Sequence, residues 1–244
     1  MSTKSTYILA VSFIVMFIYI PAALSILTFN DGDIHTIDFT VNEEVEVYDS
    51  PTGDPTTVNL VTGGSIEHRL RVFGNSIANV SDGYLKWDLY AYDNSEVTFS
   101  GGTIDAGLYG FQNSHITFSG GLIHDLRSYD NSQIDFIGGE IVTDIRAGWF
   151  DFGPHTGIIT IYGNDFNYPF GEITDSFGIL TGTLANGDFI DNDFYIYDDA
   201  SIVLVPAPSA VLLVPKQASS LMLPCSGVDD FAGTYRSCLD RLVG

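Results

Sequence analysis

Apolar and polar residues alternate in short runs through the middle of the chain. Residues 97–99 and 116–118, for example, each place a threonine between two apolar residues. A two-residue period is typical of β-strands that bury one face, and no part of residues 45–165 shows the spacing of an amphipathic helix. Paired glycines at 101–102 and 120–121 interrupt the alternation. The pattern therefore predicts many short strands joined by tight turns.

The same unit recurs along the chain. Residues 89–104, 108–123 and 126–141 align with one another, a weaker copy occupies 70–85, and about six units cover roughly residues 45–165. One unit is too short to bury its own apolar face, so the units must stack on one another. Two columns of identical residues mark the repeat, at intervals of 18 or 19 residues: Asn75, Asn94, Asn113 and Asn131, and Gly64, Gly83, Gly102, Gly121 and Gly139.

Stacking each strand on its equivalent about 4.8 Å away predicts an all-β fold, a parallel β-solenoid with three short strands per coil. We expect the asparagine column to form a buried corner with left-handed backbone and amides bonded along the stack. The glycine pairs should turn a second corner, where φ is positive. Three apolar columns should face inward: Leu70, Leu89, Leu108, Leu126 and Ile145; Val80, Phe99, Phe118 and Phe136; and Leu85, Ile104, Ile123 and Ile141.

These asparagine–serine and serine–glycine–glycine units resemble the repeats of secreted bacterial right-handed β-helix proteins, the pectate-lyase-like architecture. The resemblance covers about half of the chain and implies a right-handed coil. A coil of 18 or 19 residues is also close in length to a left-handed hexapeptide coil, but strict six-residue spacing is missing. The right-handed form is therefore favoured.

The N-terminus has the features of a secretory signal peptide. Lys4 supplies a positive charge, residues 7–20 are almost wholly apolar, and Pro21 ends the run. Small residues at Ala23 and Ser25 suit a signal peptidase, so we predict cleavage after Ser25 and export of the mature chain. The alternative is an uncleaved membrane anchor, because the apolar run is near the lower length limit of a spanning helix.

The repeat ends near residue 170. Strand-like stretches at 176–184, 194–197 and 201–205 predict a C-terminal β cap, which would cover the strand edge that a solenoid otherwise exposes. We therefore divide the chain into a signal peptide (1–25), an N-terminal cap with a first irregular coil (26–62), the solenoid repeats (63–170), the β cap (171–206) and a tail (207–244).

Residues 205–208, at the junction of the β cap and the tail, read Val-Pro-Ala-Pro. This stretch resembles the PEP-CTERM sorting region of exported bacterial proteins, which has Val-Pro-Glu-Pro at that place. Only residues 209–214 follow as an apolar run, far short of the roughly 20 residues of a membrane span, and no arginine cluster follows them. The resemblance therefore implies a degenerate sorting region, and we expect no stable membrane span once the signal peptide is removed.

The charge balance, the cysteines and the acidic turns indicate which partners, disulfides and metal ions the chain can have. Acidic residues outnumber basic ones 31 to 9, which gives a formal charge of −22 and argues against nucleic acid as a partner. Cys225 and Cys238 both lie in the tail, and a disulfide between them is reasonable in an exported protein. Acidic turns at 30–33, 188–193 and 198–199 offer oxygen atoms for calcium, with ordinary turn formation as the simpler interpretation. We expect no other metal or cofactor.

One column combines basic and aromatic side chains on an outward face. Its members recur at intervals of 19, 19, 18 and 19 residues, so they should lie above one another. Guanidinium groups and rings on a flat face suit acidic sugars, which makes this column a candidate carbohydrate-binding site. Stacked side chains that only shield the strands are the alternative. The members are Arg71, Tyr90, Tyr109, Arg127 and Arg146.

Two functions remain. The first is an exported, non-catalytic structural or adhesive protein of the cell envelope or extracellular matrix. The alternative is a protein that binds or degrades polysaccharide as a lyase or hydrolase. The coils are nearly constant in length, with a sizeable insertion only at residues 51–56, and nothing marks a pair of catalytic carboxylates. These features favour the first function, whereas ligand and oligomeric state stay open.

Overall fold

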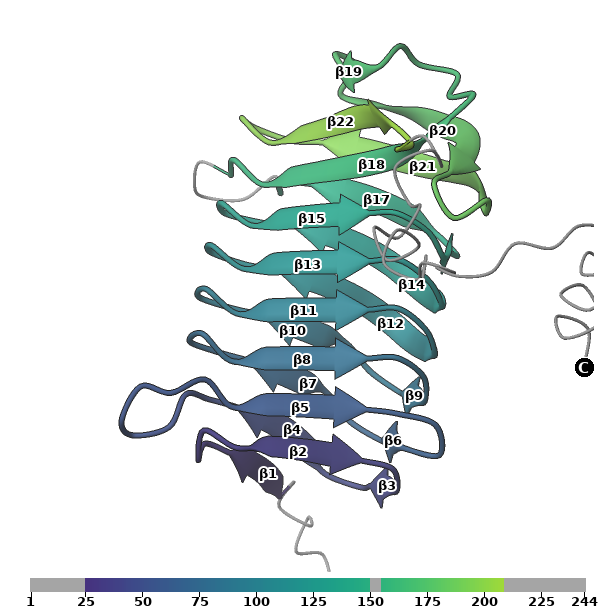
Figure 1. Cartoon of the computed structure of the whole chain (residues 1–244). Coiled ribbons are helices and arrows are strands. Elements are labelled where there is room, and N and C mark those ends of the chain that lie inside the picture. Colours follow the sequence, from purple (N-terminus) through teal and green to yellow (C-terminus); the bar gives the residue numbers. More distant parts are fainter. Residues whose placement is uncertain (1–24, 150–154, 209–244) are drawn as a thin grey trace, which may run out of the picture. The chain divides into compact units, whose positions relative to one another are not determined.

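The computed structural model describes residues 25–149 and 155–208. These residues form 22 β-strands and no helix, and the strands stack into a parallel β-solenoid (Figure 1). The all-β solenoid predicted from the repeat is therefore confirmed. In the same two ranges, no helical segment has the length and apolarity of a membrane span.

Each of the first six coils contributes one strand to each of three sheets, and neighbouring coils pair in parallel. The first sheet stacks β1 (Ile26–Phe29), β4 (Glu44–Val47), β7 (Leu70–Val72), β10 (Leu89–Ala91), the second halves of β12 (Thr103–Gly110) and β14 (Leu122–Ser128), β17 (Asp144–Ala147) and β21 (Phe189–Ile196). The second stacks β2 (Ile34–Ile37), β5 (Thr57–Leu60), β8 (Ile77–Val80), β11 (Glu96–Phe99), β13 (His115–Phe118), β15 (Gln133–Phe136), β18 (Ile158–Asn164) and β22 (Ser201–Pro206). The third stacks β3 (Thr40–Val41), β6 (Ser65–Ile66), β9 (Tyr84–Leu85), the first halves of β12 and β14, and β16 (Glu140–Ile141).

The three predicted apolar columns form the core. All are in register along their sheets, and no member is more than 6 % exposed. Phe118 lies between two other phenylalanines: its ring centroid is 5.6 Å from that of Phe99 and 4.9 Å from that of Phe136. A constant coil length between Leu70 and Ile145 explains this agreement, because it places equivalent residues above one another in these coils.

The glycine corner is also confirmed. Gly102 has φ +89°, and a Cβ there would lie 2.6 Å from the carbonyl oxygen of Gly83 in the preceding coil. Glycine is therefore required both by the left-handed backbone and by the close approach of neighbouring coils. At the start of the column the positive φ falls on Gly63, and not on Gly64 as expected.

The asparagine corner differs from the prediction by one residue. Positive φ occurs immediately before each asparagine, as at Asp93, Gln112 and Asp130. The turn at that residue directs the asparagine side chain into solvent and brings the following serine back toward the core. The asparagines are therefore exposed, and the buried members of this corner are Ser76, Ser95, Ser114 and Ser132, each 0 % exposed.

The C-terminal end of the solenoid is closed by antiparallel strands. β20 (Phe177–Leu184) pairs with β21 and with the end of β18, while β19 (Gly171–Glu172) pairs with β22 (Figure 1). The Asn167 side chain covers the outer edge of β20: its Nδ2 donates to the Ile179 carbonyl at 2.8 Å, and its Oδ1 accepts from the Thr181 amide at 2.8 Å. This end therefore offers little free strand edge.

Candidate functional site

The predicted basic and aromatic column exists on the outer face of the first sheet. Strand register places Arg71 beside Tyr90, Tyr90 beside Tyr109, Tyr109 beside Arg127 and Arg127 beside Arg146. The column continues to Tyr195 on β21. Regular parallel pairing thus brings together residues that are up to 124 positions apart in the chain (195 − 71).

The arginines of this column are paired with carboxylates. Arg71 Nε lies 2.8 Å from Glu44 Oε1, and Arg146 donates to both carboxylate oxygens of Asp144 at 2.8 and 2.7 Å. Arg127 is bonded to Asp125. Asp125 and Asp144 stand two positions before their arginines on the same strand, so they share its outer face. The guanidinium charges are therefore compensated within the sheet, which does not favour the expected binding of acidic sugars.

A second column of rings runs beside the first and was not recognised in the sequence. Neighbouring ring centroids are 4.6, 4.9, 5.0 and 4.6 Å apart, and the planes deviate from parallel by 4°, 6°, 21° and 21°. The signal was present as an aromatic fourth residue in four successive repeats. The rings belong to Tyr48, Phe73, Tyr92, Phe111 and Tyr129.

We call these two columns the aromatic–arginine strip. The rings of the second column use their faces to contact one another, so the interior members turn mainly their edges to solvent. Arginine also covers ring faces: Arg127 lies 5.2 Å from the centroid of Tyr109 and Arg146 lies 5.2 Å from that of Tyr195. These contacts stabilise the sheet but leave few ring faces on which a sugar could stack.

Burial in the strip changes the acidity of its phenols. The pKa values of Tyr92 and Tyr129 are raised, mainly by burial. Burial also raises the pKa values of Tyr90 and Tyr109, reinforced by hydrogen bonds to Asp88 and Asp125. Both effects favour the neutral phenol over the phenolate.

Alkaline titration should reveal these phenols. Because their folded-state pKa values exceed the ordinary value of 10.0, their contribution to stability is fully present below pH 10 and is lost as pH rises through the folded-state values. Phenolate absorbance should therefore appear at higher pH in the native protein than in guanidinium chloride. Tyr109→Phe should remove part of the late-titrating signal. Coincident native and unfolded curves would contradict this assignment.

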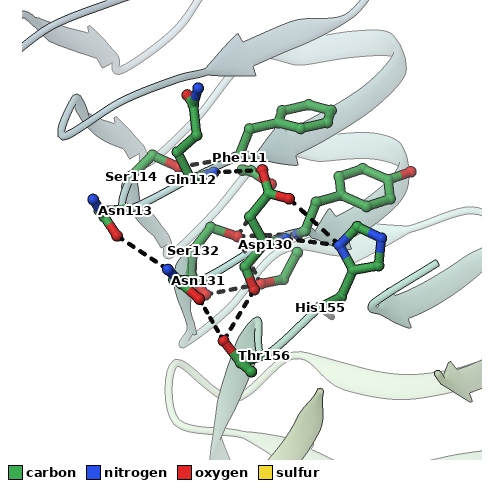
Figure 2. Close-up of polar contacts among 12 residues, drawn as sticks. Phe111, Gln112, Asn113, Ser114, Asp130, Asn131, Ser132, His155 and Thr156 are labelled. Atoms are coloured by element: carbon green, nitrogen blue, oxygen red, sulfur yellow. Dashed lines mark hydrogen bonds and ion pairs between the residues drawn. The ribbon is translucent and has the colours of Figure 1, made fainter. Parts of the chain in front are cut away.

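The corner beside the second sheet is held by a polar ladder. Backbone amides at the left-handed positions donate to side chains one coil later: Gly74 to Asp93 at 3.0 Å, Asp93 to Gln112 at 2.6 Å, and Gln112 to Asp130 at 3.0 Å. Figure 2 shows the C-terminal end of this ladder, where the Asp130 amide donates to His155 Nδ1 at 3.1 Å. The side chains therefore supply hydrogen-bond acceptors for the backbone amides of this corner.

The asparagines form a parallel ladder at the same corner. Asn113 donates to Asn94 at 3.4 Å. Figure 2 shows the next two contacts, in which Asn131 donates to Asn113 at 3.4 Å and Thr156 Oγ1 donates to Asn131 Oδ1 at 2.6 Å. The predicted amide bonding along the stack is thus present on an exposed surface. These contacts join coils and give the corner a structural role.

Substitutions at this corner should separate its exposed and buried members. Ser132→Ala should lower the free energy of unfolding by about 1–3 kcal/mol, because its buried hydroxyl bonds to Gly110, Ser128 and Tyr129. Asn113→Ala should cost about 0.5–1 kcal/mol, because water replaces its lost partners. Urea denaturation of both variants would measure the difference. Equal losses would mean that the buried member of the corner is assigned incorrectly.

A concavity of about 460 Å³ separates the glycine corner from the β20–β21 turn. Asp188, from one of the predicted calcium turns, lines it and accepts hydrogen bonds from the Gly139 amide at 2.7 Å and from Asn186 at 2.5 Å. Asp188 therefore has a structural role in closing the turn. Within residues 25–149 and 155–208, no three His, Cys, Asp or Glu side chains cluster closely enough to hold a metal ion.

Comparisons of the chain with protein-family models, curated proteins and solved structures gave no match. The β-solenoid itself is consistent with a β-helix repeat protein. Val205 and Pro206 of the sorting-like motif belong to β22, where they pair with Tyr162 and Gly163. Residues 1–24 of the predicted signal peptide and the two cysteines, Cys225 and Cys238, lie outside the described residues.

Proposed function

We propose that this chain is an exported, non-catalytic structural or adhesive protein of the cell envelope or extracellular matrix. The observation that supports this most is that side chains on the regular faces bond to one another, either within a strand or to the next coil along the stack. Arginines bind carboxylates of the same sheet, aromatic rings stack on aromatic rings, and amides bond to amides. These contacts among side chains make the solenoid rigid.

The regularity of the coils between Leu70 and Ala147 and the charge support the same proposal. The sequence predicted a sizeable insertion only at residues 51–56, but a second one lies between β17 and β18, because Gln133 pairs with Ile158, 25 positions later. The extra residues after β4, which include 51–56, form a turn closed by Ser50, whose Oγ accepts from the Asp54 amide at 3.0 Å. That turn is short, and it does not resemble the long loops with which enzymes of this architecture wall a groove. The formal charge of −22 keeps rods of this kind apart in solution at low salt.

Cell fractionation tests the proposal. Cells that express the full chain should release it to the medium or hold it in an envelope fraction that high salt extracts. Mass spectrometry should find Ile26 as the first residue, and a variant lacking residues 1–25 should stay inside the cell. Protein that leaves the membrane pellet only with detergent would contradict the proposal, as would cytoplasmic retention of the full chain.

Polysaccharide binding along the aromatic–arginine strip is the second candidate. The continuity of the strip over successive coils favours it, and the paired arginines direct it toward neutral sugars. Affinity electrophoresis in gels that contain a neutral or an acidic polysaccharide would test it. Retardation by the neutral polymer should weaken in Tyr90→Ala, whereas Tyr84→Ala, on the outer face of the third sheet, should behave as the parent. Unchanged mobility in both gels would exclude this candidate for the polymers used.

A further inference from the structure

Within residues 25–149 and 155–208, the N-terminal end of the solenoid is open, in contrast to the closed C-terminal end (Figure 1). Residues 26–62, where an N-terminal cap was expected, supply strands β1 to β5 of the stacked coils. Among the described residues, β1, β2 and β3 each pair with a strand on one side only, namely β4, β5 and β6. Three strand edges, one from each sheet, therefore face the same direction. Free edges of this kind are ready to pair with another chain.

The apolar interior is also incompletely covered at this end. Leu27 and Phe29 continue the inward columns of Val45 and Val47, which are 0 % exposed, but they are themselves only partly buried. Phe39, in the turn between β2 and β3, is 54 % exposed. Covering this end would remove apolar surface from water and stabilise the first coil.

The predicted cleavage after Ser25 would leave Ile26, the first residue of β1, as the mature N-terminus. No residue would then precede β1 to cover the open end. We propose that this end binds the same end of a second copy of the chain about a two-fold axis. The inference rests on the proposed export, because export removes residues 1–25.

The arrangement of three strand edges at the N-terminal end favours a second copy of the solenoid as the binding partner. A single extended peptide can pair with one strand edge, whereas another solenoid end presents three edges with the same spacing. A two-fold contact of identical ends is self-complementary and closes after two copies. Because antiparallel strands close the other end, the pairing stops at a dimer and does not extend into a fibre.

Charge makes this pairing dependent on salt. The turns of the first coil carry Asp31, Asp33 and Asp38. Among the residues that the structure describes, only the first of these three forms an ion pair, with His35 at 2.8 Å. Two identical ends bring these like charges together, so repulsion should weaken the dimer at low ionic strength and screening should strengthen it.

Sedimentation equilibrium of the protein purified from the medium tests the proposal. We expect a dimer whose dissociation constant falls as salt is raised. Ile34→Glu adds a charge at the open end, on a side chain that is 72 % exposed, and should raise the dissociation constant at least about tenfold. Ile179→Glu makes the same change at the closed end, where the side chain is 54 % exposed, and should have no effect. Both substitutions should leave the melting temperature of the monomer unchanged, measured at a protein concentration below the dissociation constant.

Several outcomes would overturn the pairing. A monomer at every salt concentration would do so, and so would a dimer that Ile179→Glu disrupts and Ile34→Glu does not. If Ile34→Glu lowers the melting temperature, Phe39→Glu is the second variant at the same end. Mass spectrometry of the sample separates this failure from that of signal cleavage: a dimer with residues 1–25 still attached contradicts cleavage after Ser25 alone. If those residues are still attached to a monomer, the variant lacking residues 1–25 is measured in the same way, and a monomer of that variant overturns the pairing.

Discussion

Phe118→Ala should lower the free energy of unfolding by about 3–5 kcal/mol. Phe118 is 0 % exposed and packs between the rings of Phe99 and Phe136 in the middle of the rod. The coils on either side are fixed by backbone hydrogen bonds in all three sheets, so they cannot collapse into the space that the ring leaves. Loss of transfer free energy and the remaining cavity therefore add.

Thermal and urea denaturation would measure this loss. Phe189→Ala is the matched control, because it makes the same change on a side chain that is 69 % exposed, and it should alter stability by no more than about 0.5 kcal/mol. If Phe118→Ala instead melts within a degree or two of the parent, Phe118 does not belong to the core column.

Gly102→Ala should cost about 2–5 kcal/mol, from two sources. The residue has φ +89°, where an L side chain is strained by about 1–2 kcal/mol. Its new Cβ would also lie 2.6 Å from the Gly83 carbonyl oxygen, and overpacking of this kind adds about 1–3 kcal/mol. Because the obstruction is backbone of the preceding coil, no side-chain rotation relieves it.

Gly53→Ala provides a control for the backbone strain. Gly53 has the same φ of +89°, but no atom lies within 4 Å of its Cβ position. It should therefore lose only the strain component, and the difference in unfolding free energy between the two variants measures the contact between coils. Equal losses in the two variants would show that the coils do not approach closely at Gly102.

In the aromatic–arginine strip, the sequence predicted which residues are neighbours but not which side chains bond to one another. Spacing alone placed Arg127 beside Tyr109 correctly, because every coil repeats the same positions. The pairing of Arg127 with Asp125 was not recognised, although the two residues are only two positions apart. Sequence spacing places side chains on one face, but rotamers and burial decide which of them bond.

The asparagine corner differs from its prediction for another reason. The asparagine column was found by its period, yet the left-handed backbone lies at the preceding residue, as at Gln112, where φ is +55°. A column of identical residues does not reveal which residue turns the chain. That depends on where the following serine must return to contact the core.

The sequence by itself determined the stacked strands, the three inward columns and the glycine corner, because a constant period fixes the partner of each residue. It also predicted a β cap, while the handedness of the coil remains a prediction. Only the tertiary structure distinguished the two ends of the rod. Closure by Asn167 and β19 and exposure of β1, β2 and β3 depend on contacts between segments outside the regular repeat, where no period exists to indicate them.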